Sequence, residues 1–158
     1  MCLILDTNVA SEFFAQPVSA EFRPLIDWVS NPKTKGRIVT GGKNQAELSR
    51  MARGPVMAML VELRRSGRVR TIECGASDGS DLETQEINTV CQSDDPHVIL
   101  LARKSGARLL CAKDQALIKD FGNKQLIDNP RGIVFPLAAP QKSVTRILRN
   151  AHSNTCAI

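Results

Sequence analysis

The side chains best suited to chemistry in this 158-residue chain are carboxylates. Four of them stand where apolar runs end or amphipathic runs begin, and these are Asp6, Glu47, Asp95 and Asp114. If they lie within a few ångströms of one another in a low-dielectric cleft, a divalent cation or raised pKa values must relieve their repulsion. Ligands that are all oxygen favour Mg²⁺ or Mn²⁺. Because the chain has only two histidines, a serine or cysteine triad has almost no base to use, and acid and metal chemistry remain.

A simpler alternative makes three of these acids ordinary helix N-caps. Asp6, Asp95 and Asp114 each precede a segment with helical periodicity, and a proline at the first helical position follows Asp95. Aspartate and asparagine are both preferred capping residues. This alternative explains each acid separately, but it does not explain why Glu47 and Asn8 accompany them.

Strand-like and helix-like segments alternate along the chain and must position these acids. Short apolar or alternating runs predict strands over 1–5, 37–40, 68–72, 108–112 and 132–135. Helical spacing, with Pro and Gly at the ends, predicts helices over 9–15, 22–29, 43–51, 56–63, 81–91, 96–105 and 115–121. The alternation predicts an α/β fold, a three-layer α/β/α sandwich with a central, mainly parallel sheet and 68–72 at its edge. Since parallel strands share one carboxyl edge, we expect the four acids to converge there.

Length and composition fit a single domain. Hydrophobic residues make up 42% of the chain and charged residues 23%, as in ordinary globular proteins, and no apolar run approaches the length of a membrane span. We expect residues 1–137 to form the domain and residues 138–158 to be a basic, loosely ordered tail. Five scattered cysteines without a C-x-x-C pair, and no signal peptide, predict a cytoplasmic protein and argue against zinc.

The net charge of +5 favours a polyanionic partner. Basic residues are concentrated between positions 50 and 70, and the candidates for phosphate contacts are Arg50, Arg53, Arg64 and Arg65. The alternative is a solvated helix face without a ligand.

Several stretches together resemble the PIN-domain family over about residues 2 to 136. They are Leu3-Ile4-Leu5-Asp6-Thr7-Asn8, Gly41-Gly42, Ala46-Glu47-Leu48, Asp94-Asp95-Pro96-His97-Val98-Ile99, and Ala112-Lys113-Asp114 with Asp120. The D-T-N triplet alone is weakly specific, but four acidic segments in this order on these elements are fairly specific. The resemblance implies a small α/β/α sandwich with a parallel sheet.

Active PIN domains are metal-dependent ribonucleases, some of them the toxins of toxin–antitoxin pairs. The resemblance therefore implies hydrolysis of RNA phosphodiester bonds by a metal-activated water, with Asp6, Glu47, Asp95 and Asp114 holding Mg²⁺ or Mn²⁺. Asn8 would orient an acid or a water, and Asp120 would be either an outer-shell acid or a surface residue. By the same resemblance an antitoxin protein and a homodimer are expected partners.

Two positions depart from the family pattern. Ala112 stands where many members have a hydroxyl residue, so a hydrogen bond near the last acid is expected to be missing. Lys113 could turn inward and compete with a cation, or point to solvent. Neither departure removes a primary acid.

Two other functions stay open. An aspartyl-phosphate phosphatase also places an aspartate after its first strand, but it usually needs a second acid two residues later, where this chain has Asn8. A catalytically inactive PIN module that binds RNA or a protein partner is the non-enzymatic alternative. Binding of Mn²⁺ distinguishes this module from the nuclease.

Overall fold

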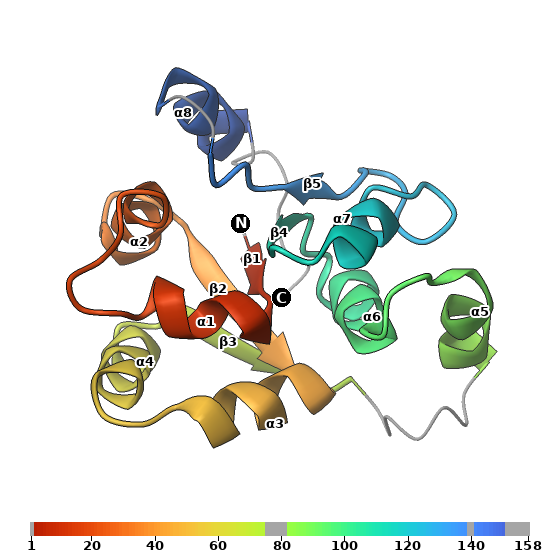
Figure 1. Cartoon of the computed structure of the whole chain (residues 1–158), viewed down its shortest axis with the longest axis horizontal. Helices are drawn as coiled ribbons and strands as arrows, with labels where there is room; N and C mark the ends of the chain where they lie inside the picture. Colours follow the sequence, from red (N-terminus) through yellow and green to blue (C-terminus); the bar gives the residue numbers. More distant parts are fainter. Residues whose placement is uncertain (1, 75–81, 139–140, 151–158) are drawn as a thin grey trace.

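The sheet is five-stranded and all-parallel, as Figure 1 shows for the computed structural model, which describes residues 2–74, 82–138 and 141–150. Its strands are β1 (Cys2–Leu5), β2 (Arg37–Gly41), β3 (Val69–Ile72), β4 (Leu109–Cys111) and β5 (Ile133–Val134). They lie in the order β3-β2-β1-β4-β5, and every neighbouring pair is parallel. The predicted parallel α/β/α architecture is confirmed, including the edge position of β3.

Helices cover both faces of this sheet. They are α1 (Thr7–Phe13), α2 (Arg23–Ser30), α3 (Gly42–Met51), α4 (Pro55–Arg65), α5 (Leu82–Val90), α6 (Pro96–Ser105), α7 (Gln115–Phe121) and α8 (Gln141–Asn150). One hydrophobic cluster joins the sheet to α1, α2, α4 and α8, and a second joins the opposite face to α5, α6 and α7 (Figure 1). None of the helices formed by the described residues has the length and apolar character needed to cross a membrane.

The central strand β1 is buried on both faces because its four residues are all apolar. Leu3 and Leu5 enter one cluster and Ile4 enters the other, as the alternation of side chains along a strand requires. From β1 the chain proceeds to β2 on one side and returns later to β4 on the other. The carboxyl end of β1 is therefore the point where the strand order reverses, which is where open parallel sheets bind ligands.

Helix α3 lies at this same edge of the sheet, where it contacts both α1 and α6. Two glycines allow the close approach at its start. A Cβ on Gly41 would lie 2.6 Å from the carbonyl oxygen of Ile72 and 2.8 Å from Sγ of Cys74, and Gly42 has a φ of +50°. A side chain at either position would push α3 away from the sheet or strain the backbone.

The expectation of a loosely ordered tail after residue 137 is wrong for residues 141–150. These form α8, which packs on α2, and its Val144 and Leu148 are only 3% and 9% exposed. Val144, Ile147 and Leu148 recur at i, i+3 and i+4, a helical stripe that the basic composition of the segment obscured. Residues 139–140 and 151–158 of the expected tail lie outside the described part of the chain.

Candidate functional site

Asp6 is held rigidly at the carboxyl end of β1. Its backbone N–H donates to the carbonyl of Cys111 at the end of β4, at 3.0 Å. The preceding carbonyl, that of Leu5, accepts a hydrogen bond from Nδ2 of the fully buried Asn44 on α3, at 3.1 Å. The backbone that carries the Asp6 carboxylate is thus held by contacts from both sides, and the residue is only 2% exposed.

The folded protein disfavours the ionised form of the Asp6 carboxylate. Its pKa is raised from 3.8 to about 6, mainly by burial and further by the negative charges of Asp95 and Asp114, while the N–H of Asn8 partly offsets these effects. Its Oδ1 accepts a long hydrogen bond of 3.5 Å from that N–H, whereas its buried Oδ2 has no hydrogen-bond partner among the described residues. The structure therefore brings three of the predicted acids, Asp6, Asp95 and Asp114, into one electrostatic cluster.

The N-cap alternative holds for two of these aspartates and not for the third. Asp6 caps α1 through the bond to Asn8, and Oδ1 of Asp114 accepts from the N–H of Leu117 at 2.7 Å to cap α7. Asp95 occupies the N-cap position of α6, but within the described chain its carboxylate makes no capping hydrogen bond. Helix capping therefore does not explain the Asp95 side chain.

Glu47 joins the site through a histidine. From α3, its Oε2 accepts a hydrogen bond from the Thr7 hydroxyl at 3.2 Å and lies 3.6 Å from Nε2 of His97, while its Oε1 lies 3.7 Å from Nζ of Lys43. Nδ1 of His97 lies 3.8 Å from Oδ1 of Asp95. The imidazole therefore stands between Glu47 and Asp95.

The sequence did not predict a role for His97, which comes from the first turn of α6. Its side chain is 10% exposed, and its buried Nδ1 has no hydrogen-bond partner in the described ranges. Burial lowers its pKa more than the carboxylates of Glu47 and Asp95 raise it, so the imidazole is neutral at neutral pH. Two features of the sequence could have indicated His97. It is one of only two histidines, and it lies two residues after the expected ligand Asp95.

The donor chemistry of the site fits Mg²⁺ or Mn²⁺. Carboxylate oxygens are the ligands that such cations prefer, and a cation would satisfy Oδ2 of Asp6 and relieve the repulsion from Asp95 and Asp114. Within residues 2–74, 82–138 and 141–150, however, no three His, Cys, Asp or Glu side chains are already arranged to hold an ion. The acids would have to close around the metal.

Asp120 is not the surface residue that one of the two sequence interpretations allowed. It is 2% exposed, and its Oδ2 accepts hydrogen bonds from the Cys91 thiol at 3.0 Å and from the N–H groups of Gln92 and Ser93 at 2.9 and 2.8 Å. Burial acts to raise its pKa, but these hydrogen bonds outweigh that effect and hold the pKa below its usual value. Asp120 thus fixes the segment that leads into Asp95.

The remaining predicted neighbours have weaker connections to the site. Asn8 is exposed and contacts Asp6 only through its backbone N–H, so orientation of an acid or water by its side chain stays a prediction. Ala112 is buried in the core next to α6 and α7. Nζ of Lys113 lies 2.7 Å from Glu12 Oε2, in an ion pair on the surface.

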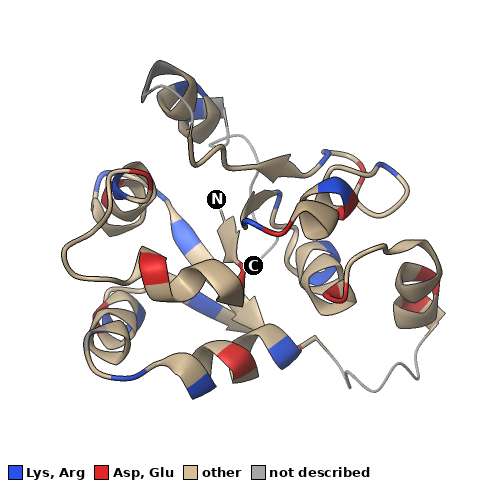
Figure 2. Ribbon diagram, in the orientation of Figure 1, with Lys and Arg blue, Asp and Glu red and all other residues tan. Residues whose placement is uncertain are grey.

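The four candidate RNA-binding arginines are all exposed: Arg50, Arg53, Arg64 and Arg65. They lie on α3, on α4 and between the two helices, and Figure 2 shows basic residues on these elements as well as elsewhere on the molecule. The nearby Arg68 has a structural role instead, since its guanidinium donates to the carbonyls of Asn31, Thr34 and Gly36. Their exposure is compatible both with contacts to phosphates and with a solvated helix face that has no ligand.

If these arginines contact phosphates, the double variant Arg64→Ala, Arg65→Ala will bind single-stranded RNA more weakly than wild type. The plot of log affinity against log salt should become shallower by about 0.7 for each lost contact, because fewer counterions are released. Filter binding or fluorescence anisotropy at several salt concentrations measures both quantities. Unchanged affinity and slope would show that α4 presents only a solvated face.

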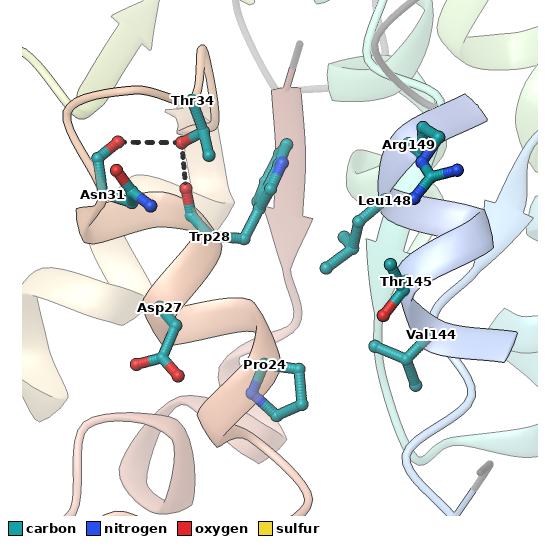
Figure 3. A pocket seen from close by; sticks show the side chains of 9 residues that line it. All are labelled: Pro24, Asp27, Trp28, Asn31, Thr34, Val144, Thr145, Leu148 and Arg149. Atoms are coloured by element: carbon teal, nitrogen blue, oxygen red, sulfur yellow. Dashed lines mark hydrogen bonds between the residues drawn. The ribbon is translucent and has the colours of Figure 1, made fainter. Parts of the chain in front are cut away.

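A separate cavity of about 440 Å³ lies between α2 and α8, away from the acids (Figure 3). In Figure 3, Trp28 and Leu148 face each other across it, and among the described residues that line it Asp27 is the one carboxylate. A single carboxylate provides no site for paired acid or metal chemistry, so this cavity is not the candidate active site.

Comparisons of the chain with protein-family models, with curated proteins and with solved structures gave no match.

Proposed function

We propose that this protein is a divalent-metal-dependent ribonuclease that hydrolyses RNA phosphodiester bonds, as the resemblance to PIN domains implies. One observation carries the proposal. Asp6, Asp95 and Asp114 come from three separate parts of the chain, and at the carboxyl edge of the sheet the latter two lie near enough to Asp6 to raise its pKa. Like charges beside a buried carboxylate disfavour its ionised form, and a site that binds a cation explains why the half-buried Asp95 and the exposed Asp114 lie near the buried Asp6.

The aspartates would hold the ion, and Oδ2 of Asp6 is the oxygen most in need of it because it is buried and lacks a partner in the described chain. A bound Mg²⁺ or Mn²⁺ would supply charge stabilisation at the scissile phosphate and a lower pKa for the attacking water. Asn44 and the Cys111 carbonyl keep Asp6 in place through the backbone of residues 5 and 6. The exposed arginines of α3 and α4 would bind phosphates of the RNA strand.

The direct test is cleavage of single-stranded RNA by purified wild-type protein with Mg²⁺, with Mn²⁺ and with EDTA. Cleavage is expected with either metal and should stop in EDTA. Asp6→Asn should cleave at least about 100-fold more slowly, since even the loss of an outer partner of a metal site costs about 10- to 100-fold.

Asp128→Asn is a matched control, because Asp128 is an exposed acid in the connection from α7 to β5. It should cleave at the wild-type rate. Cleavage that continues undiminished in EDTA, or an Asp6→Asn variant as active as this control, would rule out the proposed site.

A non-enzymatic PIN-like module that binds RNA or a protein partner is the second candidate. It is favoured by the absence, in the described residues, of any three side chains already placed to hold an ion. A module of this kind would bind RNA through its basic face but would take up no Mn²⁺ and cleave nothing. Equilibrium dialysis with Mn²⁺ separates it from the nuclease.

A further inference from the structure

His97 is a buried imidazole between two of the predicted acids. Its ring lies between Glu47 on α3 and Asp95 at the start of α6, with only a tenth of its side chain exposed. Nδ1 is buried and unpartnered within the described residues. Buried polar atoms usually have a hydrogen-bond partner, so an exception requires an explanation.

The gap between His97 and Asp95 is too wide for a hydrogen bond and suits a shared ion. Nδ1 and Asp95 Oδ1 are 3.8 Å apart, beyond hydrogen-bond range. In an octahedral site with bond lengths of about 2.1 Å, donor atoms lie about 3 Å apart when adjacent and about 4.2 Å apart when opposite. The observed separation falls between these two limits, so a small closure would bring both atoms onto one ion.

Glu47 lies where the orienting partner of a ligating histidine is usually found. Such histidines donate the N–H of their second ring nitrogen to a carboxylate, which fixes the ring and its tautomer. Oε2 of Glu47 lies 3.6 Å from Nε2 of His97, slightly beyond hydrogen-bond range, so this bond would form when the site closes around the metal. The Thr7 hydroxyl holds that same oxygen at 3.2 Å, and Lys43 lies beside the other. Glu47 is therefore itself held in place beside the ring.

We propose that Nδ1 of His97 is a ligand of the metal bound by Asp6, Asp95 and Asp114, with Glu47 orienting the ring through Nε2. This rests on the proposed acidic metal site and identifies its metal. An imidazole ligand favours first-row transition metals over Mg²⁺, so the site prefers Mn²⁺. Glu47 is then an orienting residue of the site.

Pulsed electron paramagnetic resonance of the wild-type protein with Mn²⁺ tests this without RNA. A directly bound imidazole nitrogen gives a modulation of the Mn²⁺ echo that carboxylates and water do not give. We expect this nitrogen signal in the wild type, and we expect it to disappear in His97→Asn. In Mn²⁺ titrations this variant should bind at least about 10-fold more weakly, while its Mg²⁺ affinity should change by less than about 3-fold.

His152→Asn is the matched control, since residue 152 is the only other histidine in the chain. It should retain both the nitrogen signal and the Mn²⁺ affinity. Mn²⁺ bound tightly by the wild type but without a nitrogen signal would overturn the role of His97 and leave the aspartate site standing. No Mn²⁺ binding by the wild type would overturn both. The wild-type spectrum decides the question even if His97→Asn fails to fold.

Discussion

In EDTA at neutral pH, Asp6→Asn is expected to unfold at a higher temperature than the wild-type protein. The folded-state pKa of Asp6 is raised from 3.8 to about 6, mainly by burial and then by the charges of Asp95 and Asp114. A shift of this size corresponds to about 3 kcal/mol of lost stability when the group is ionised. Asparagine removes the charge and still caps α1. The gain should raise the melting temperature by about 6 to 12 °C.

The pH dependence of this difference follows from the sign of the shift. Because the folded state holds the Asp6 proton more tightly than the unfolded state, the penalty is fully present above about pH 6 and is relieved as the pH falls toward 3.8. The advantage of Asp6→Asn should therefore shrink between pH 7 and pH 4. Calorimetry in EDTA across this range measures it, and a variant less stable than wild type at pH 7 would show that Asp6 is not held as an uncompensated charge.

Asp120→Ala is expected to destabilise the protein by about 3 to 5 kcal/mol. The substitution leaves the N–H groups of Gln92 and Ser93 and the Cys91 thiol without their acceptor, and each buried donor left unsatisfied costs about 1 to 3 kcal/mol. Urea unfolding at pH 7 measures the loss. Asp128→Ala, at an exposed position, should change stability by less than about 0.5 kcal/mol.

The pH dependence at Asp120 has the opposite sign to that at Asp6. Its folded-state pKa is lowered, so its contribution is complete above the ordinary value of 3.8 and is lost as the pH falls below it. The difference between wild type and Asp120→Ala should be constant from pH 5 to pH 7. Similar unfolding free energies for Asp120→Ala and Asp128→Ala would show that the bonds to residues 91–93 contribute little.

The fold was predictable because local signals and the global architecture agree. The strands β1 and β4 are continuous apolar runs of the kind that a doubly covered parallel sheet requires, and Pro96 and Gly106 mark the ends of α6. Helix α8 was missed because the charge of its segment was given more weight than its apolar spacing. The apolar stripe of Val144, Ile147 and Leu148 is enough to pack one face of α8 against the apolar face of α2.

The parts of the site that lie at strand ends were predictable from the sequence. The contacts that depend on the direction of a side chain were not. Asp6 and Asp114 follow adjacent parallel strands, so topology alone brings them together. The contact of Glu47 with His97 depends on how the first turn of α6 faces α3, which sequence spacing does not specify. Asp120 had a usable signal, since it lies three residues after the buried Leu117 and shares the inward face of α7.

The central claim, that the three aspartates bind a divalent cation, is tested most directly by the melting temperature of Asp95→Asn. Asp95 is the informative position because, in the described chain, its carboxylate makes no capping bond that the substitution could disturb. In EDTA the variant should melt higher than wild type, since one like charge near Asp6 is removed.

With Mn²⁺ at about 100 times its dissociation constant, the wild type should gain about 2.7 kcal/mol, and Asp95→Asn should gain much less. Equal melting temperatures in EDTA together with equal responses to Mn²⁺ would contradict the claim, and Asp95 would then be only the residue that precedes α6.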